Sequence, residues 1–380
     1  MIYLTYNDQP TGVYSSQVND VCNYLNRELN AGIRLVAIIS LHDFGKNKQS
    51  ILSEVPDALV IPALPMARFW KFSAILFAVY CFFTGQKSVI ARNVMAAKIA
   101  LAAKRAGVVR KVCFDGRGAI AAEWKEYDVV AYPEFKRNIA DWEKDAVINS
   151  DFRIAVSEEL VKWWGEAYGY NRPDHAVIPC TLQSNFSLLL PDDSTLTRRR
   201  VSYGFAAEDI ILVYSGSASG WQSFRVFDEV FGRVLSASHR YKLVFMSKPD
   251  DIINEMKVKY PNQVSDKWFK HSEVQDFLQI GDYGILYREK SITNRVASPT
   301  KFAEYLSAGL PVIISEGIGD YSLFVSKHGC GHVLKESDDY LPERTVYETR
   351  NKMISLVKEY FTKDANKSNY IYLLSSINKV

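Results

Sequence analysis

The sequence SPTKFAEYLSAGLPVIIS, residues 298–315, predicts a helix followed directly by a buried strand. Ser298 is a suitable N-cap, and Pro299 suits the first helical position. Gly309 suits the left-handed residue that ends a helix, and an apolar strand follows from Pro311 to Ser315. A helix joined this closely to an apolar strand is typical of a parallel α/β sheet.

The start of this helix also carries a ligand signal. A capping box would place Glu or Gln at position 301, where the chain has Lys301. A cation in the first turn opposes the helix dipole, but it is reasonable if a bound anion lies between the backbone N–H groups and the lysine. Glu304, one turn further along, is placed to accept hydrogen bonds from a ribose. A solvated lysine at a surface helix end is the alternative.

The rest of the chain repeats the alternation of strand and helix. In the first half we predict apolar strands at 2–6, 35–40, 58–61, 89–91, 111–115, 151–156 and 176–178. After a linker and an entry helix within 181–200, we predict strands at 210–215, 242–246, 283–286 and 311–315. This pattern indicates two doubly wound α/β halves, in which ligands bind at the carboxyl ends of the strands.

The loop after the strand at 210–215 begins with Gly216 and Ser217. Small residues at this position let backbone amides approach a phosphate. No Gly-Lys-Ser/Thr run follows, so the loop is not a Walker motif and ATP hydrolysis is not expected.

Composition excludes several classes of protein. The chain has 46 Lys and Arg against 43 Asp and Glu, a net charge of +3, which is too small to indicate a nucleic-acid binder. Its five cysteines are scattered and form no C-x-x-C pair, which favours reduced thiols over a disulfide framework or a zinc site. The N-terminus shows no signal-peptide pattern, so we expect a cytoplasmic protein.

One segment points to a membrane surface. Residues 72–83, FSAILFAVYCFF, are almost wholly apolar, but the run is shorter than the roughly 20 residues that span a bilayer. Residues 58–114 contain no Asp or Glu and nine basic residues: Arg68, Lys71, Lys87, Arg92, Lys98, Lys104, Arg105, Arg110 and Lys111. We therefore expect 58–114 to contact an anionic membrane surface peripherally, on the inner face of the cell membrane. The alternative is a helix buried on the sheet, with the basic residues scattered by chance.

Residues 298–315 resemble the donor-binding signature of retaining GT-B glycosyltransferases, especially the group 1 enzymes of glycosyltransferase family 4. Three further segments are similar to the family in the same order: YNDQPTGVYSSQV at 6–18, FDGRG at 114–118, and DFRIAVSEELVKWW at 151–164 followed by VIPC. The resemblance implies an α/β protein with the GT-B fold, in which two Rossmann-like doubly wound parallel-sheet domains face each other across a cleft. It implies an acceptor-side domain at 1–183, a donor-binding domain at 184–364, and a final helix at 365–380 that crosses back to the first domain.

The resemblance also implies an activity. The chain would transfer a hexose from a UDP-, GDP- or dTDP-linked donor to a saccharide or lipid-linked saccharide, with retention and without a metal or other cofactor. Bacterial surface polysaccharide synthesis is the expected setting. The donor-binding residues would be Gly12, Gly216, Ser217, Lys248, Ser298, Pro299, Thr300, Lys301 and Glu304. Arg288 and Arg295 would stabilise the departing diphosphate, and Asp115 and Arg117 would contact the sugar or the acceptor.

One departure from the family keeps two alternatives open. The family commonly has a Glu-x7-Glu pair, but Val296 stands eight residues before Glu304. The loop 289–298, EKSITNRVAS, also lacks the usual Glu-Gly-Phe-Gly run, and Glu289 can substitute only if this loop folds back. The alternatives are an inactive homologue that acts as a partner subunit, and a nucleotide-sugar epimerase.

Overall fold

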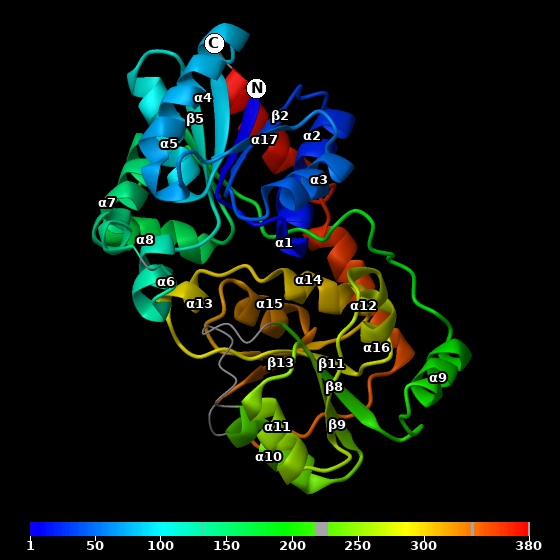
Figure 1. The fold of residues 1–380 in the computed structure, drawn as a ribbon. Coiled ribbons are helices and arrows are strands. Elements are labelled where there is room, and N and C mark those ends of the chain that lie inside the picture. Colours follow the sequence, from blue (N-terminus) through cyan, green and yellow to red (C-terminus); the bar gives the residue numbers. More distant parts are fainter. Residues whose placement is uncertain (131, 217–226, 336–337, 379–380) are drawn as a thin grey trace. The chain divides into compact units, whose positions relative to one another are not determined.

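A computed structural model describes residues 1–130, 132–216, 227–335 and 338–378. Tertiary contacts divide the chain into two units. Unit 1 comprises 1–184, 296–298 and 362–380, and unit 2 comprises 185–295 and 299–361. In Figure 1 unit 1 runs from blue to green with a red C-terminal helix, and unit 2 is mainly green, yellow and orange.

Unit 1 is a parallel sheet with helical connections. Its strands are β1 (Ile2–Tyr6), β2 (Arg34–Ile39), β3 (Leu59–Pro62), β4 (Ser88–Arg92), β5 (Lys111–Gly116), β6 (Phe152–Ala155) and β7 (His175–Val177). Its helices are α1 (Gly12–Tyr14), α2 (Asp20–Leu29), α3 (Phe44–Glu54), α4 (Trp70–Thr84), α5 (Asn93–Arg105), α6 (Ile120–Tyr127), α7 (Pro133–Asn149), α8 (Glu158–Tyr168) and α17 (Lys367–Asn378). A π-helical turn (Ser15–Asn19) joins α1 to α2, and a 3-10 turn (Ala67–Phe69) precedes α4.

The seven strands follow the order β3-β2-β1-β4-β5-β6-β7, and each described pair is parallel. Crossover helices cover both faces of such a sheet, so its strands are continuous apolar runs such as the fully buried IYLTY of β1. Ser157 caps the start of α8, because its hydroxyl accepts a hydrogen bond from the Leu160 N–H at 3.1 Å.

The C-terminal helix α17 completes unit 1. Leu373 and Ile377 are fully buried in the core that also contains residues of β1, β2 and β6. The Ser88 hydroxyl donates a hydrogen bond to the Ile377 carbonyl at 2.8 Å, and Asn369 donates one to the Val177 carbonyl at 3.0 Å. Figure 1 shows this red helix among the blue and cyan elements of unit 1.

Unit 2 repeats the architecture with six strands. These are β8 (Ile210–Ser215), β9 (Tyr241–Met246), β10 (Val264–Asp266), β11 (Tyr283–Leu286), β12 (Val312–Ser315) and β13 (Gly331–Leu334). The helices are α9 (Asp193–Ser202), α10 (Phe227–Ala237), α11 (Asp251–Lys259), α12 (His271–Leu278), α13 (Ile292–Arg295), α14 (Thr300–Ser307), α15 (Tyr321–His328) and α16 (Tyr347–Leu356), which a π-helical turn (Val357–Phe361) extends.

The strand order in unit 2 is β10-β9-β8-β11-β12-β13, and each described pair is parallel. The predicted strands at 210–215 and 283–286 are confirmed with the same bounds. Sequence reasoning missed β10 and β13. Both are short strands at the two edges of the sheet, and VSD and GHVL lack the apolar run that marks a central strand.

The helix that opened the sequence analysis begins one residue later than predicted. Pro299, not Ser298, is the N-cap of α14, and no side chain caps this end. The Ser298 hydroxyl instead accepts a hydrogen bond from the Cys180 N–H at 2.9 Å within unit 1. At the other end the prediction is confirmed, because Gly309 adopts φ +79°.

Candidate functional site

The strand order locates the expected ligand position in each unit. In a doubly wound sheet, ligands bind beyond the carboxyl ends of the strands where the strand order reverses. This switch point lies between β1 and β4 in unit 1 and between β8 and β11 in unit 2. Polar and charged residues follow the strands at both places.

In unit 2, Arg288 follows β11, and its backbone N–H and carbonyl groups are both hydrogen-bonded to Ser315. Its N–H donates a hydrogen bond to the Ser315 hydroxyl at the end of β12, at 2.9 Å, and that hydroxyl donates to the Arg288 carbonyl at 2.8 Å. The guanidinium contacts the Asn294 side-chain oxygen at 3.3 Å. Asn294 is fully buried and also donates to the Glu289 carbonyl at 3.0 Å, so it orders the loop after β11.

A cavity of about 400 Å³ opens beside this loop, at the carboxyl ends of β11, β12 and β13. Most of the residues that line it are polar or charged, and charges of both signs are present. The lining residues are Glu229, Val230, Arg233, Tyr287, Arg288, Glu289, Lys290, Ser315, Glu316, Leu334, Lys335 and Asp338. The four basic residues among them can stabilise a bound anion such as a phosphate.

Lys301 and Glu304, two of the predicted donor-binding residues, form an ion pair within α14. Lys301 Nζ lies 2.7 Å from Glu304 Oε2, and both side chains are mostly buried. Lys301 is therefore partly neutralised by the next turn of its own helix. A ligand that binds both a cation and a hydrogen-bond acceptor can engage the two groups together, as a ribose phosphate does.

Tyr305 ties α14 to the switch point of unit 2. Its hydroxyl accepts a hydrogen bond from the Ser215 N–H at 2.7 Å and donates one to the Ile285 carbonyl at 3.1 Å. The ring lies over Gly284, where an added Cβ would sit 2.2 Å from a ring carbon. Burial raises the pKa of Tyr305 well above its ordinary value, so the hydroxyl stays protonated and the link is maintained.

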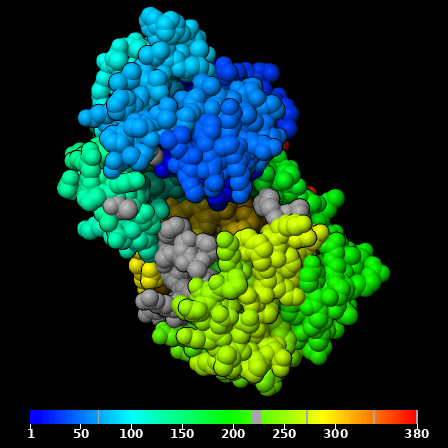
Figure 2. Space-filling view, viewed as in Figure 1, coloured from blue at the N-terminus to red at the C-terminus, as the bar shows by residue number. Residues whose placement is uncertain are grey.

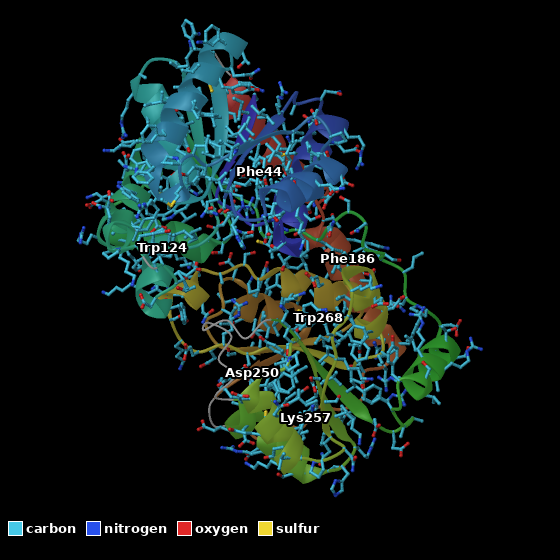
Figure 3. All side chains as sticks on the ribbon, in the orientation of Figure 1. Phe44, Trp124, Phe186, Asp250, Lys257 and Trp268 are labelled. Carbon is cyan, nitrogen blue, oxygen red and sulfur yellow. The ribbon has the colours of Figure 1, made fainter. Side chains whose placement is uncertain are left out.

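The remaining donor-side predictions are dispersed over unit 2. Gly216 follows β8, and a Cβ there would lie 2.6 Å from the Tyr214 hydroxyl, which favours glycine. Lys248 follows β9 and lies 5.8 Å from the ring of Trp268, a largely exposed residue labelled in Figure 3. Arg295 ends α13, Pro299 and Thr300 begin α14, and Ser217 lies outside the described residues.

The position that departs from the family pattern is a packing position. Val296 is fully buried, and its carbonyl accepts a hydrogen bond from the Ser157 hydroxyl at 2.7 Å. Glu289, the suggested substitute, lines the cavity beside Arg288. Glu289 is the carboxylate nearest in sequence to position 296, and it thus lies at the cavity wall.

Unit 1 has its own charged cluster at the switch point. Asp8 follows β1, Arg92 ends β4, and Arg92 Nε lies 3.5 Å from Asp8 Oδ2. On the neighbouring strand β5, fully buried Asp115 pairs with Arg117 at 2.8 Å and accepts a hydrogen bond from Tyr3. The Asp115 carboxylate therefore orients the Arg117 guanidinium.

The electrostatics of this cluster are balanced, with two carboxylates and two guanidinium groups. Burial raises the pKa of Asp8, although Arg92 acts in the opposite direction. Burial lowers the pKa of Arg117, but the attractions of Asp115, Tyr3 and Cys180 together outweigh it, and the pKa is raised well above its ordinary value. Among the described residues, Asp8 Oδ2, Arg92 Nη1 and Asn93 Oδ1 are buried without a hydrogen-bond partner, a capacity that suits a ligand rich in hydroxyl groups.

Sequence reasoning missed Asp8, Arg92 and Asn93 as site residues. Each follows or ends an apolar strand beside the switch point, and that position in the sequence could have identified them as site residues. Gly12 lies in the same region, exposed at the start of α1. The five cysteines are free, and all five are buried. In the described ranges, no group of three or more His, Cys, Asp or Glu is arranged to bind a metal ion.

The C-terminal part of the chain, residues 234–365, matches the family model of the glucosyltransferase 3-like C-terminal domain. A sequence comparison with curated proteins found no significant match. The match thus covers most of unit 2, including all of α14 and the cavity-lining residues from Tyr287 to Asp338, but not Glu229, Val230 and Arg233.

Solved structures match over essentially the whole length of the chain. They include a glycosyltransferase from Rickettsia africae ESF-5 (TM-score 0.69, 14% identity, 100% of this chain and 98% of that chain). They also include Anabaena Alr3699/HepE in complex with UDP and glucose (0.65, 13%, 99% of each chain) and the lipopolysaccharide outer core galactosyltransferase WaaB (0.63, 12%, 99% of each chain). At these identities the likeness establishes the fold. The chain has the GT-B fold, as its sequence resemblance implied.

Proposed function

We propose that this chain is a retaining, metal-independent glycosyltransferase that takes its sugar from a nucleotide donor bound by unit 2. The observation that carries the proposal is that Arg288, the Lys301–Glu304 pair and most of the lining of the cavity beside β11 come from the segment that matches a glucosyltransferase domain. A UDP-linked hexose is the first candidate donor, because HepE was solved with UDP and glucose.

The donor interactions follow from the chemistry of the side chains. The Glu304 carboxylate accepts hydrogen bonds from the ribose hydroxyls, and Lys301, next to it at 2.7 Å, faces the adjoining phosphate. Arg288, whose backbone is fixed by Ser315, stabilises the negative charge that develops on the departing diphosphate. Because these cations supply the positive charge, the reaction proceeds without a metal.

The acceptor binds unit 1 at the switch point. Hydroxyl groups of a saccharide both donate and accept hydrogen bonds, and the cluster of Asp8, Arg92, Asn93 and Arg117 offers both kinds of partner. The buried atoms of Asp8, Arg92 and Asn93 that lack a hydrogen bond support this assignment. A saccharide or lipid-linked saccharide of a bacterial surface polysaccharide is the proposed acceptor, since WaaB is a lipopolysaccharide galactosyltransferase of the same fold.

The first experiment measures nucleotide binding by thermal shift and calorimetry with UDP, GDP, dTDP and their sugar conjugates. A nucleotide present at 100 times its Kd stabilises the protein by about 2.7 kcal/mol. Glu304→Ala should weaken binding by about 1.5–3 kcal/mol, because it removes charged hydrogen bonds to the ribose. Glu348→Ala is the matched control, since Glu348 is an exposed carboxylate in the first turn of α16.

Lys301→Ala separates the two halves of the pair. Glu304→Ala also frees the Lys301 charge for the phosphate, so a loss of affinity in this variant is assigned to the ribose contacts. Lys301→Ala should weaken the binding of nucleoside diphosphates, whereas the binding of the nucleoside without phosphates should be almost unchanged. The absence of any nucleotide response in the wild type would remove the basis of the proposal.

Turnover distinguishes the proposed enzyme from its alternatives. With the bound donor and a saccharide acceptor, the anomeric configuration of the product, followed by NMR, should match that of the donor. Activity should persist after treatment with EDTA. Nucleotide binding without turnover on any acceptor would indicate a partner subunit, and epimer formation without acceptor would indicate an epimerase.

A further inference from the structure

We propose that the exposed face of α4 is a docking surface for an anionic lipid bilayer. The proposal stands apart from the transferase assignment, because it concerns the surface of unit 1 alone. No helix in the described part of the chain is long and apolar enough to cross a membrane, and α4 itself has 15 residues. The contact is therefore peripheral, with the helix lying in the interface.

Six large apolar side chains form a stripe along α4. They recur every three or four residues, at 72, 75/76, 79 and 82/83, and therefore lie on one face of the helix. Between 48% and 81% of each is exposed: Phe72, Ile75, Leu76, Val79, Phe82 and Phe83. Scattered exposed apolar residues need no explanation, but a continuous stripe of this size is typical of a binding surface.

The opposite face of α4 is occupied by protein. Ser73, Ala74, Phe77 and Cys81 are buried, and the helix packs against α5. The alternative stated from the sequence, a helix buried against the sheet, therefore holds for one face only. An isolated interfacial helix exposes a polar face to water. In this protein the face of α4 opposite the stripe packs against α5 instead.

The stripe continues through the turn that leads into the helix. Leu64, Met66 and Phe69 are 45%, 45% and 37% exposed and directly precede α4. In Figure 2 the sky-blue part of the surface, the colour of residues around 70–85, is open to solvent. Exposed apolar side chains thus extend over both the turn and the helix.

Basic residues lie at both ends of the stripe. Arg68 and Lys71 are exposed at its N-terminal end. Beyond its C-terminal end, the Arg110 N–H donates to the Lys87 carbonyl at 2.8 Å, which brings these two residues together. In the described parts of the chain, none of the four forms an ion pair, and residues 58–114 contain no acidic residue.

The other basic residues of this segment are already engaged. Arg92 pairs with Asp8, Lys104 and Lys111 with Asp151, and Arg105 with Asp145. Lys98 lies 4.8 Å from the rings of both Trp70 and Trp142. The attraction to a membrane is thus carried by the four basic residues that form no ion pair in the described part of the chain. One of them, Lys87, donates a hydrogen bond from its ammonium group to the Val108 carbonyl at 3.1 Å.

The charges favour a bilayer over a second copy of the chain. A two-fold pair of α4 stripes would bring the basic ends of one copy against those of the other, and the stripe has no carboxylate to compensate. Anionic lipid headgroups complement the same charges, while the acyl chains accept the apolar side chains. A bilayer thus matches both the charge and the hydrophobicity of this face.

The test is sedimentation of the full chain with vesicles of phosphatidylcholine, alone or with about 30% phosphatidylglycerol. The wild type should bind the anionic vesicles, and binding should weaken as NaCl rises from about 0.1 M to about 0.5 M. The double variant Ile75→Gln/Phe82→Gln should lose about tenfold or more in vesicle affinity. Arg68→Gln/Lys71→Gln should lose the preference for anionic vesicles.

Val258→Gln/Leu323→Gln is the matched control, because these residues are 84% and 71% exposed on helices of unit 2. It should bind vesicles like the wild type, and circular dichroism should show all variants folded. Equal vesicle binding by the wild type and the α4 double variant would overturn the proposal. So would a wild-type dimer that the α4 variant converts to a monomer, since the stripe would then be a contact between copies. Neither result bears on nucleotide binding, which is measured separately.

Discussion

At the scale of single residues, Glu143 on α7 shows how one buried carboxylate can organise a neighbouring helix. Its oxygens accept hydrogen bonds from the N–H groups of Ile120 and Ala121, at 3.0 and 2.9 Å, and from the Tyr168 hydroxyl at 2.9 Å. It thereby satisfies backbone donors at the start of α6 and links three helices of unit 1. The side chain is fully buried, and burial raises its pKa to about 7.

This shift predicts a pH dependence of stability. The folded-state pKa lies above the ordinary value of 4.5, so the folded protein binds the proton more tightly than the unfolded chain. The contribution of Glu143 to stability is therefore complete below about pH 4.5 and is lost as the pH rises through about 7. Its loss should amount to about 1–3 kcal/mol.

Urea denaturation of the wild type and of Glu143→Gln between about pH 5 and about pH 8 measures this contribution. The difference in unfolding free energy between the two proteins should change across that range, because the glutamine does not titrate. Glu134→Gln, an exposed residue at the start of the same helix, should leave the pH profile unchanged. A pH-independent difference for Glu143→Gln would contradict the assignment.

At the scale of elements, α17 follows unit 2 in sequence but packs into the core of unit 1. Leu373 is fully buried in the core of unit 1, whereas Ile371, two residues earlier on the same helix, is 50% exposed. Polar and apolar residues are mixed around this helix, KSNYIYLLSSIN, so its sequence alone does not mark which face is buried. The contacts with β5, β6 and β7 decide it.

Leu373→Ala should destabilise the protein by about 2–5 kcal/mol, because it leaves a cavity in the core. Ile371→Ala should change the unfolding free energy by less than about 0.5 kcal/mol. Chemical denaturation followed by circular dichroism measures both. Similar losses in the two variants would mean that α17 is not docked through the Leu373 face.

At the scale of the whole molecule, unit 1 is built from both ends of the chain. Lys363, beyond unit 2 in sequence, forms an ion pair with Asp20 and donates a hydrogen bond to the Leu182 carbonyl at 3.0 Å. The Tyr24 hydroxyl donates to Asp364 at 2.8 Å. The first 184 residues therefore contain the complete seven-stranded sheet but not the helix that covers part of it.

A fragment of residues 1–184 should accordingly fold poorly, because the core that α17 covers would face water. A fusion of 1–184 to 362–378 through a short flexible linker should restore a cooperative thermal transition. Calorimetry and dye binding to exposed apolar surface measure the difference between the two proteins. A cooperative transition in the shorter fragment would show that α17 is dispensable for unit 1.

The sequence by itself determined the α/β class, the central strands and the C-terminal end of α14. Parallel strands are covered on both faces, so runs such as IILVYS in β8 are apolar throughout and are recognised without any partner. Gly309 marked the end of α14 because few other residues adopt φ +79° without strain. The resemblance to GT-B proteins came from the same segment, where helix, glycine and strand follow in a fixed order.

Only the tertiary structure decided which polar residues gather at one place. Asp8, Arg92 and Asp115 are distant in sequence and meet because β1, β4 and β5 are neighbours in the sheet. It also decided that Lys301 pairs with Glu304, that Ser298 contacts Cys180 instead of capping α14, and that half of α4 remains exposed. Local sequence encodes the propensity of each element, but charge pairing and burial depend on neighbours that only strand order brings together.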